Sequence, residues 1–306
     1  MKEAEQAHGF LKNGTGSILG TYLLWGALPL YFALTAPAHA FEVVSARVVF
    51  SLIFCVFLLA LTRGGFARVI SLMKSPRMLG ILAACALLIG ANWTLYVVAT
   101  TSGHTLDASL GYFINPLVSV FLGVLFLGER LRPAQWIAVA LAGISIILMS
   151  IFYGQVPWLG LGLAGSFGFY GLVKSKLGGK VTPLTSLTLE TLVLLPLALL
   201  SMGIFFSTGT ATLVSEGSAH FWILAASGII TAVPLLLFAD AASKLPLNVI
   251  GMAQYITPTL QFLIAFFIFD EPLTTERLLG FIGIWIACLI FASSTMRHSR
   301  TARKAQ

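Results

Sequence analysis

Polar and aromatic side chains recur at one depth within the long apolar segments of this chain. If the midpoint of each segment is placed at the centre of a bilayer, these side chains fall within about two helical turns of that centre. They are Trp25, Asn92, Trp93, Tyr96, Tyr112, Asn115, Gln254, Tyr255, Thr257 and Gln261. Aromatic faces and amide dipoles, without a carboxylate at this depth, predict a pocket for a neutral or zwitterionic small molecule with an apolar part.

The composition places these segments in a membrane. Hydrophobic residues make up 58% of the chain and charged residues 9%, with a mean hydropathy of +0.95, whereas soluble proteins carry roughly 25% charged residues. Ten apolar segments are long enough to cross the hydrocarbon core as helices. They cover residues 14–36, 42–62, 78–101, 104–127, 131–153, 156–174, 185–207, 219–243, 247–269 and 273–296. The sequence therefore predicts an all-α integral membrane protein with ten transmembrane helices.

The two halves of the chain align at a constant offset without a gap. Residues 14–152 form the first predicted repeat and residues 156–294 the second, with five segments each. We call this alignment, in which position 14 matches position 156 and position 152 matches position 294, the repeat register. Because five is odd, the second repeat must enter the membrane from the opposite side and is therefore inverted. Inverted repeats are typical of transporters that work by alternating access.

Prolines occur at the same depth in both halves. Pro116 aligns with Pro258, and Pro234 aligns with Asn92. A proline removes a donor and frees a carbonyl, so we expect helix discontinuities at the three prolines, with polar partners nearby. Paired discontinuities favour a substrate site. The alternative is that the prolines only kink the helices and that Asn92 and Asn115 hydrogen-bond between helices as packing contacts.

Most Lys and Arg residues fall in loops on one side of the predicted membrane. This bias predicts that both termini, namely segment 1–13 and the basic tail 297–306, are cytoplasmic. We attribute the net charge of +7 to orientation and contact with membrane lipid rather than to binding of nucleic acid. Segments 131–153 and 273–296 carry almost no polar residues, so we expect them to face lipid or a second copy of the chain; a monomer and a homodimer both remain open.

Charged side chains within the segments form two groups at different depths. The outer group is Glu42, Arg47 and Asp107, and the inner group is Lys174, Glu190, Asp240 and Lys244. A charge deep in the bilayer costs roughly 2.5 to 3.5 kcal/mol on insertion scales. We therefore expect Arg47 to pair with Asp107 or Glu42, and Glu190 with Lys174 or Lys244.

These charges are candidates for two polar gates. In that hypothesis Arg47 and Asp107 close the outer side, Glu190 and Asp240 the inner side, and each gate forms when the opposite side opens. The alternative is that Glu42 and the lysines extend to the lipid headgroups and that Asp240 forms an i,i+4 pair with Lys244. We favour this alternative for those residues, and gating for Arg47 and Glu190.

Sequence motifs of enzymes are missing from the chain. It has no nucleotide-binding loop, zinc-protease motif or nucleophile elbow, and Cys55, Cys85 and Cys288 have no metal-ligand spacing. We expect no catalysis, metal or cofactor. We predict a secondary transporter that exports a small neutral or zwitterionic metabolite or drug-like compound. The alternative is an ion-conducting channel or a sensory membrane protein, and an integral membrane enzyme ranks third.

Several long stretches resemble a known family. In the first half they are residues 22–26, 92–96, 103–104, 108–117 and 123–131; in the second half they are residues 189–192, 231–235, 254–256, 258–262 and 271–273. They resemble the RarD-type branch of the EamA family, in the drug/metabolite transporter superfamily. The resemblance covers nearly the whole chain and implies a ten-helix permease of the bacterial inner membrane, built from two inverted EamA repeats. It implies no single substrate. Ala46 precedes Arg47 where the family commonly has His, which argues against a proton-carrying role for that position.

Overall fold

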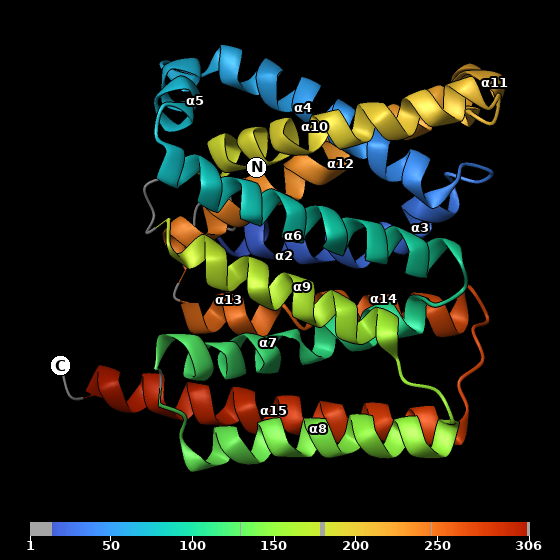
Figure 1. Ribbon diagram of the computed structural model, residues 1–306. Coiled ribbons are helices and arrows are strands. Elements are labelled where there is room, and N and C mark those ends of the chain that lie inside the picture. Colours follow the sequence, from blue (N-terminus) through green and yellow to red (C-terminus); the bar gives the residue numbers. More distant parts are fainter. Residues whose placement is uncertain (1–13, 129, 178–180, 246, 305–306) are drawn as a thin grey trace, which may run out of the picture.

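The computed structural model of the protein describes residues 14–128, 130–177, 181–245 and 247–304, and side chains within 14–128, 130–177, 181–245 and 249–294. All regular secondary structure within the described residues is helical (Figure 1). The predicted cytoplasmic segment 1–13, Glu129 and the side chains of the basic tail 297–306 lie outside the described residues.

The predicted apolar segments all coincide with helices. The helices are α2 (Thr15–Gly26), α3 (Leu28–Ala33), α4 (Ala40–Leu61), α5 (Gly65–Met73), α6 (Pro76–Thr101), α7 (Thr105–Leu127), α8 (Pro133–Tyr153), α9 (Trp158–Ser175), α10 (Pro183–Ser207), α11 (Thr212–Ser215), α12 (Gly217–Lys244), α13 (Leu247–Ala253), α14 (Ile256–Phe267) and α15 (Thr275–Lys304). Within the described residues, nine segments are long and apolar enough to cross a membrane. The 18-residue α9 is not among them, because its glycines and Lys174 lower its hydropathy.

Turn chemistry sets several helix ends. Ser75 and Thr182 accept hydrogen bonds from the backbone N–H of Met78 and Thr185, and a proline follows each at the first helical position. Gly128 and Gly154 end α7 and α8 with φ of 69° and 78°, a conformation that costs glycine little. These caps begin and end the long helices close to the predicted boundaries.

The prolines break the helices less than the sequence suggested. α7 continues through Pro116 and α12 continues through Pro234, so the predicted discontinuities there are wrong. A neighbouring helix contacts α12 at this point, since the Thr21 hydroxyl of α2 donates to the Pro234 carbonyl at 3.2 Å. A break does lie just before Pro258, between α13 and α14, and an unpredicted break at Ala27 separates α2 from α3.

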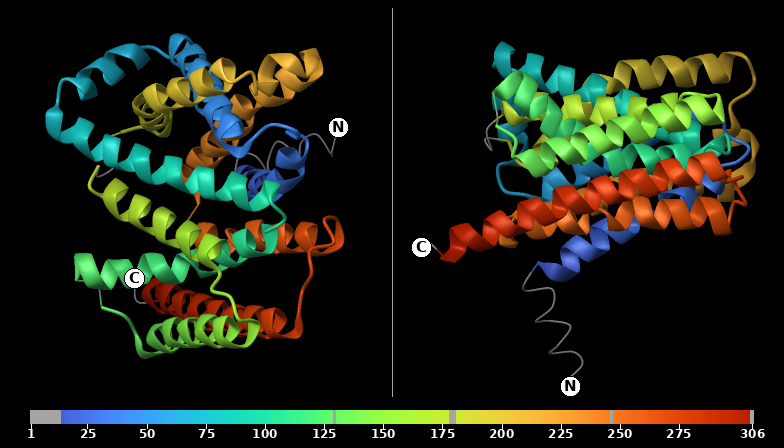
Figure 2. Two further views of the ribbon diagram at one scale, coloured as in Figure 1. Left: turned by 45° about the vertical axis from the view of Figure 1, so that its right-hand side comes forward. Right: turned by 90° about the horizontal axis from the view of Figure 1, so that it is seen from below.

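The helices form a bundle in which equivalent segments of the two halves pack together. α4 packs against α10, α7 against α14, and α8 against α15 (Figures 1 and 2). α9 lies against α6 and α7, while α2 lies against α12 and α14. The bundle therefore surrounds a central space lined by α2, α4, α6, α7, α9, α10, α12 and α14.

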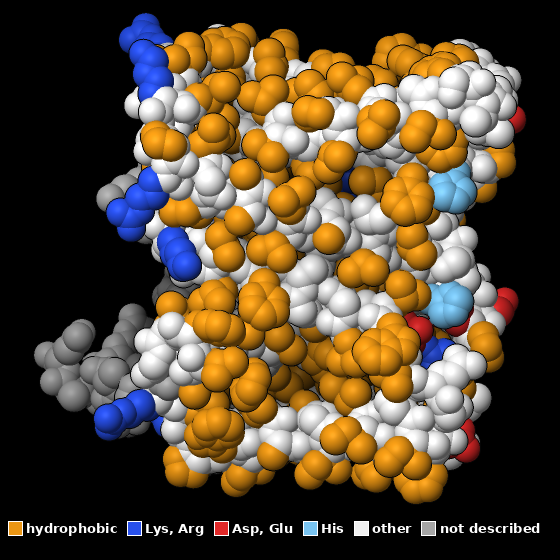
Figure 3. All heavy atoms as spheres, in the orientation of Figure 1, with side chains coloured by type: hydrophobic (Ala, Val, Ile, Leu, Met, Phe, Trp, Pro, Cys, Tyr) orange, Lys and Arg blue, Asp and Glu red, His pale blue; other side chains and the backbone are white. Residues whose placement is uncertain are grey.

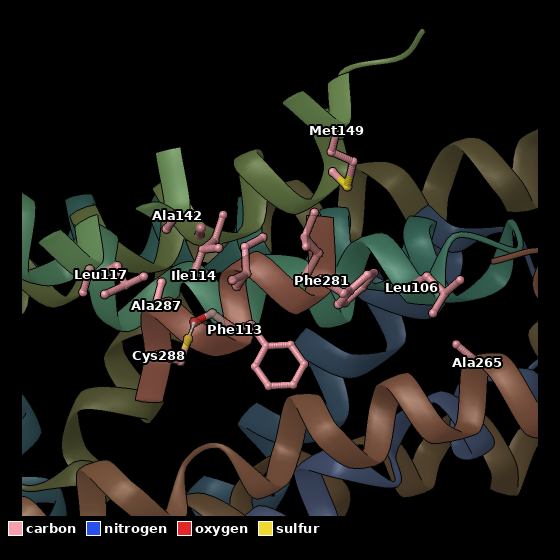
Figure 4. Packing of buried hydrophobic residues seen from close by; sticks show 14 residues of the cluster. Leu106, Phe113, Ile114, Leu117, Ala142, Met149, Ala265, Phe281, Ala287 and Cys288 are labelled. Carbon is pink, nitrogen blue, oxygen red and sulfur yellow. Dashed lines mark hydrogen bonds between the residues drawn. The ribbon is translucent and has the colours of Figure 1, made fainter. Parts of the chain in front are cut away.

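Apolar side chains hold the α8 and α15 pair to the bundle. The largest buried cluster joins α7, α8, α14 and α15 around Phe113 and Phe281 (Figure 4), whose rings lie 6.4 Å apart edge to face. The Cys288 thiol donates to the Phe113 carbonyl at 3.3 Å. Cys55, Cys85 and Cys288 are all buried and free, as expected of small apolar residues.

The charged side chains divide the surface of the bundle into two ends. Figure 3 shows Lys and Arg mainly along one edge and Asp, Glu and His along the other, with apolar side chains between them. We call the end that carries Arg63, Arg68 and Lys174 the basic end, and the end that carries Asp107 and Glu271 the acidic end. An exposed apolar band between two charged rims fits a lipid environment.

Candidate functional site

A cavity of about 350 Å³ lies between the helices. Every side chain predicted to form the mid-depth pocket lines it except Tyr255. The lining predicted residues are Trp25, Asn92, Trp93, Tyr96, Tyr112, Asn115, Gln254, Thr257 and Gln261. Of the predicted gating charges and prolines, Arg47, Glu190 and Pro258 also line it, whereas Asp107, Asp240, Pro116 and Pro234 do not.

Tyr255 faces away from the cavity. Its ring packs against the cluster around Phe113, whereas its neighbour Gln254 lines the cavity. Successive residues of a helical turn point about 100° apart, so Tyr255 can face the cluster while Gln254 faces the cavity.

Arg47 is a buried cation in the cavity wall. Its side chain is 6% exposed, and its Nε donates to the Thr231 hydroxyl at 2.8 Å. The guanidinium carbon lies 4.3 Å from the centroid of the Trp93 ring and 5.8 Å from that of Phe32. Within the described part of the chain, Arg47 forms no ion pair. Hydroxyl and aromatic contacts therefore stabilise this charge in place of a carboxylate.

The predicted partners of Arg47 are engaged elsewhere. Asp107 forms an ion pair with Arg277 at 2.5 Å. Arg277 is in the first turn of α15, which begins at Thr275 and packs against α7. Glu42 is fully buried and accepts from the Leu213 backbone N–H at 2.9 Å and from the Thr212 hydroxyl. The predicted pairing of Arg47 with Asp107 or Glu42 is therefore wrong, and so is the expectation that Glu42 extends to headgroups.

Amide and aromatic groups form the wall between α2, α6, α7 and α14. Gln261 Nε2 donates to the Trp25 carbonyl at 3.1 Å and to the Tyr96 hydroxyl at 2.9 Å. A carbonyl oxygen can only accept a hydrogen bond, so the Gln261 amide nitrogen must face the Trp25 carbonyl. Gln261 Oε1 therefore points away from that carbonyl. Among the described residues, neither Gln261 Oε1 nor Asn115 Oδ1 has a hydrogen-bond partner, although both atoms are buried. Tyr96 and Tyr112 meet edge to face 5.6 Å apart.

Two of the lining residues also hold helices together. Asn92 Nδ2 donates to the Leu163 carbonyl and the Ser166 hydroxyl, both at 3.0 Å, and so links α6 to α9. The Thr257 hydroxyl donates to the Tyr22 carbonyl at 3.0 Å and links α14 to α2. For Asn92, the predicted alternative of an interhelical packing contact is confirmed.

The cavity continues to the basic end along α9 and α10. Glu190 is 1% exposed and accepts from Lys174 at 3.0 Å, Ser186 at 2.7 Å and Tyr170 at 3.2 Å. The Lys174 ammonium also contacts the Tyr170 hydroxyl. The predicted ion pair of Glu190 with Lys174 is confirmed, and these four side chains all line the cavity.

The other inner pair lies outside the cavity. Asp240 pairs with Lys244 at 2.6 Å in the predicted i,i+4 arrangement and accepts from the Ser17 hydroxyl at 2.6 Å. Its side chain is 40% exposed. Asp240 therefore lies on the surface, where it ties α12 to α2.

The acidic end is closed by polar contacts between α7 and the segment before α15. Glu271 accepts from the backbone N–H groups of Thr105 and Leu106 at 2.6 and 2.8 Å, at the start of α7. Asp107, which pairs with Arg277, lies in the same first turn of α7. The pair of Lys174 and Glu190 at the basic end is formed in the same structure.

Close packing of α7 on α9 seals the same end. A Cβ added to Gly111 would lie 2.6 Å from the Gly160 carbonyl oxygen, and one added to Gly160 would lie 2.7 Å from the Asp107 carbonyl oxygen. Only glycine permits so close an approach. Among the described residues, neither these glycines nor the charged residues that close the acidic end line the cavity.

The repeat register identifies lining residues that were not predicted. Phe167, Leu235 and Phe238 line the cavity and align with Trp25, Trp93 and Tyr96. Thr231 likewise aligns with Ile89, and both residues line the cavity. Applying the repeat register to the predicted residues would have found Phe167, Leu235 and Phe238, but not Thr231 or Ile89, because neither of that pair was predicted. Among the described residues, no group of His, Cys, Asp or Glu could hold a metal ion.

Comparison with known proteins identifies the family. The EamA-like transporter family matches residues 13–151. Protein RarD of Streptomyces exfoliatus is 42% identical, over 98% of this chain and 93% of its own length. Protein RarD of Escherichia coli (strain K12) is 39% identical over 96% of this chain and 98% of its own length. A protein of Vibrio cholerae named an uncharacterized transporter is 39% identical over 96% of this chain and 97% of its own length.

A solved crystal structure of a protein shares the fold. The two structures superpose with a TM-score of 0.57 at 17% sequence identity, over 92% of this chain and 97% of the other. At that identity the likeness concerns the fold alone. The relatives named above span nearly the whole chain and are bacterial proteins, one of them named a transporter, so the chain is a multi-pass membrane transporter and not an enzyme. It belongs to the EamA-like transporter family and, within it, to the RarD-type permeases.

Proposed function

We propose that the protein is a secondary transporter of the bacterial inner membrane that moves a small neutral or zwitterionic molecule, with an apolar part, by alternating access. One observation carries this proposal: positions that align in the repeat register, such as Trp25 and Phe167, line one central cavity from both halves of the chain. A site between two repeats is how many secondary transporters bind substrate at mid-membrane. Export is the direction we propose.

The proposed architecture is ten transmembrane helices in two inverted repeats, with both termini in the cytoplasm. The packing of α4 on α10, α7 on α14 and α8 on α15 supports it, because a pseudo-twofold axis between inverted repeats would bring equivalent helices together. α9 then counts as the sixth span. The basic end is cytoplasmic by the positive-inside rule. Apolar faces of α8 and α15 contact lipid or a second copy of the chain.

In this orientation the molecule is inward-facing. The cavity wall reaches Lys174, Val181 and Pro183 at the basic end. At the acidic end the contacts of Asp107 and Glu271 separate the cavity from the outside. A channel would need a polar path that continues through both ends, so this asymmetry favours a carrier over the alternative of a channel.

Counterflow in proteoliposomes tests the proposal. Vesicles are preloaded with unlabelled amino acids or small aromatic compounds, and uptake of the labelled compound is measured for wild type, Asn115→Ala and Gln261→Ala. Thr259→Ala is the matched control, because Thr259 lies on α14 with Gln261 but is exposed and away from the cavity. Saturable exchange that only the two cavity variants lose is the expected result. Flux that never saturates and survives in both cavity variants would contradict a carrier.

A further inference from the structure

The charges in the cavity wall do not balance. Among the described residues that line the cavity, Arg47 and Lys174 are cationic and Glu190 is anionic. Lys174 and Glu190 neutralise each other in an ion pair at 3.0 Å. One positive charge, that of Arg47, is left in excess. A buried charge without a partner is unfavourable, so buried charges are normally paired or bind a ligand.

Arg47 presents the free part of its guanidinium to the cavity. The Nε donates to Thr231 and the plane stacks near Trp93, which orients the group. Among the described residues, its two terminal nitrogens make no hydrogen bond. A guanidinium with a free fork matches a carboxylate, which it binds through two parallel charge-assisted hydrogen bonds.

Acceptors without a donor occupy another part of the same wall. Asn115 Oδ1 and Gln261 Oε1 are buried and unpartnered within the described residues, and both side chains line the cavity. The contact of Gln261 Nε2 with the Trp25 carbonyl determines which way that amide points. A buried acceptor without a donor costs about as much as a lost hydrogen bond. Each of these oxygens exposes less than 1 Å² of surface, so a ligand N–H group reaches it once the amide side chain turns toward the cavity.

We propose that the cavity binds a small carboxylic acid as its carboxylate, held by the guanidinium of Arg47, with an N–H-bearing group at Asn115 and Gln261. The rings of Tyr96 and Tyr112, which line the same cavity, would contact the apolar part. An α-amino acid with an apolar side chain has this pattern of one anion, one donor group and one apolar body. The inference rests on the proposed transport site, but it concerns binding and can be tested without transport.

The test measures ligand binding to the purified full-length protein in nanodiscs. Matched pairs of acid and amide serve as probes: phenylalanine and phenylalaninamide, leucine and leucinamide, 3-phenylpropionate and 3-phenylpropionamide. The readouts are the shift in the unfolding midpoint, since a ligand of the native state stabilises it, and quenching of tryptophan fluorescence, because Trp25 and Trp93 line the cavity. We expect each acid to raise the unfolding midpoint and quench the fluorescence, and its amide to do neither. The amino acids should bind more tightly than 3-phenylpropionate.

Variants then assign the binding to Arg47. Arg47→Gln is expected to weaken binding of the acids about 100-fold or more, which corresponds to the loss of one bidentate charged contact, and Arg47→Lys to weaken it less. The comparison of acid with amide on wild-type protein needs no variant, so a folding defect in Arg47→Gln leaves it intact. The proposal is overturned if no acid acts more strongly than its amide, or if a folded Arg47→Gln protein binds acids as wild type does. Acid binding without counterflow would contradict the transport proposal alone.

Discussion

Arg47 and Thr231 join the two halves of the chain across the cavity wall: the Nε of Arg47, on α4, donates to the hydroxyl of Thr231, on α12, at 2.8 Å. Both side chains are buried. This is the only hydrogen bond of the Arg47 side chain among the described residues, so Thr231 and the ring of Trp93 together orient the guanidinium.

Thr231→Val should therefore disturb the site more than its small change in volume suggests. It leaves a buried donor unsatisfied, which costs about 1 to 3 kcal/mol, and lets the guanidinium turn away from the cavity. Thr231→Ser keeps the hydroxyl and is the control. We expect Thr231→Val to lower the affinity for carboxylate probes in the fluorescence titration and Thr231→Ser to retain it. Equal titration curves would show that Thr231 does not position Arg47.

The ion pair of Asp107 and Arg277 should stabilise closure at the acidic end. The two side chains are 16% and 9% exposed, and removal of one member of a buried pair costs about 3 kcal/mol. Asp107→Asn should lower the unfolding midpoint and speed the reaction of a membrane-impermeant thiol reagent with a cysteine placed at Tyr112. The double variant Asp107→Asn with Arg277→Gln should recover part of both effects. Additive single effects would refute the coupling.

Glu271 should stabilise the start of α7 through its charge. Its carboxylate accepts from two backbone N–H groups at the helix N-terminus, a contact worth about 1 to 2 kcal/mol. Glu271→Gln is therefore expected to lower the unfolding midpoint. Glu276→Gln makes the same change in charge in the first turn of α15 and should lower the midpoint less, because that carboxylate is exposed and contacts only its own turn. Similar effects of both substitutions would mean that net charge, and not the cap, is responsible.

Sequence patterns predicted the helices well because each depends on local properties. The length of an apolar run and a capping residue such as Ser75 suffice to place a helix within a few residues. The depth of the pocket could also be predicted from the sequence, since Asn115, Gln261 and most of the other predicted residues line the cavity. What relates these residues is depth along a helix, which the sequence encodes directly.

The sequence did not predict which helices pack side by side. Arg47 and Asp107 have similar depths, yet the helix that faces Asp107 is α15, which supplies Arg277. Depth does not determine which helix stands beside which, nor whether adjacent residues such as Gln254 and Tyr255 face the same side. Pro116 was misjudged for a related reason, because neighbouring helices decide whether a proline breaks its helix.

Lys174 and Lys244 offer a matched comparison of two ion pairs. Glu190 is 1% exposed, whereas Asp240 is 40% exposed. Lys174→Met leaves a buried carboxylate without its cation and should lower the free energy of unfolding by about 3 kcal/mol. Lys244→Met should change it little, because exposed pairs contribute little. Thermal unfolding of both variants measures the difference. A larger effect of Lys244→Met than of Lys174→Met would contradict the conclusion that the Lys174–Glu190 pair contributes more to stability.

Two glycines of α9 should respond in opposite ways to alanine. In Gly160→Ala the new methyl group would meet the Asp107 carbonyl, whereas a Cβ at Gly165 meets nothing within 4 Å. We expect Gly160→Ala to force α7 and α9 apart and lower the unfolding midpoint. Gly165→Ala should raise it slightly, since alanine favours a helix by about 1 kcal/mol over glycine. Unchanged stability in Gly160→Ala would mean that the two helices do not approach so closely.

The glycine contact between α7 and α9 has no copy in the other half of the chain. In the repeat register, Gly160 and Gly111 align with Ile18 and Ala253, which carry side chains and pack in an apolar cluster between α2 and α13. Closure at the basic end would have to use these bulkier residues. In the proposed alternating access, the two states would therefore differ in free energy, and we expect the substrate-free protein to rest mostly in the state with its acidic end shut.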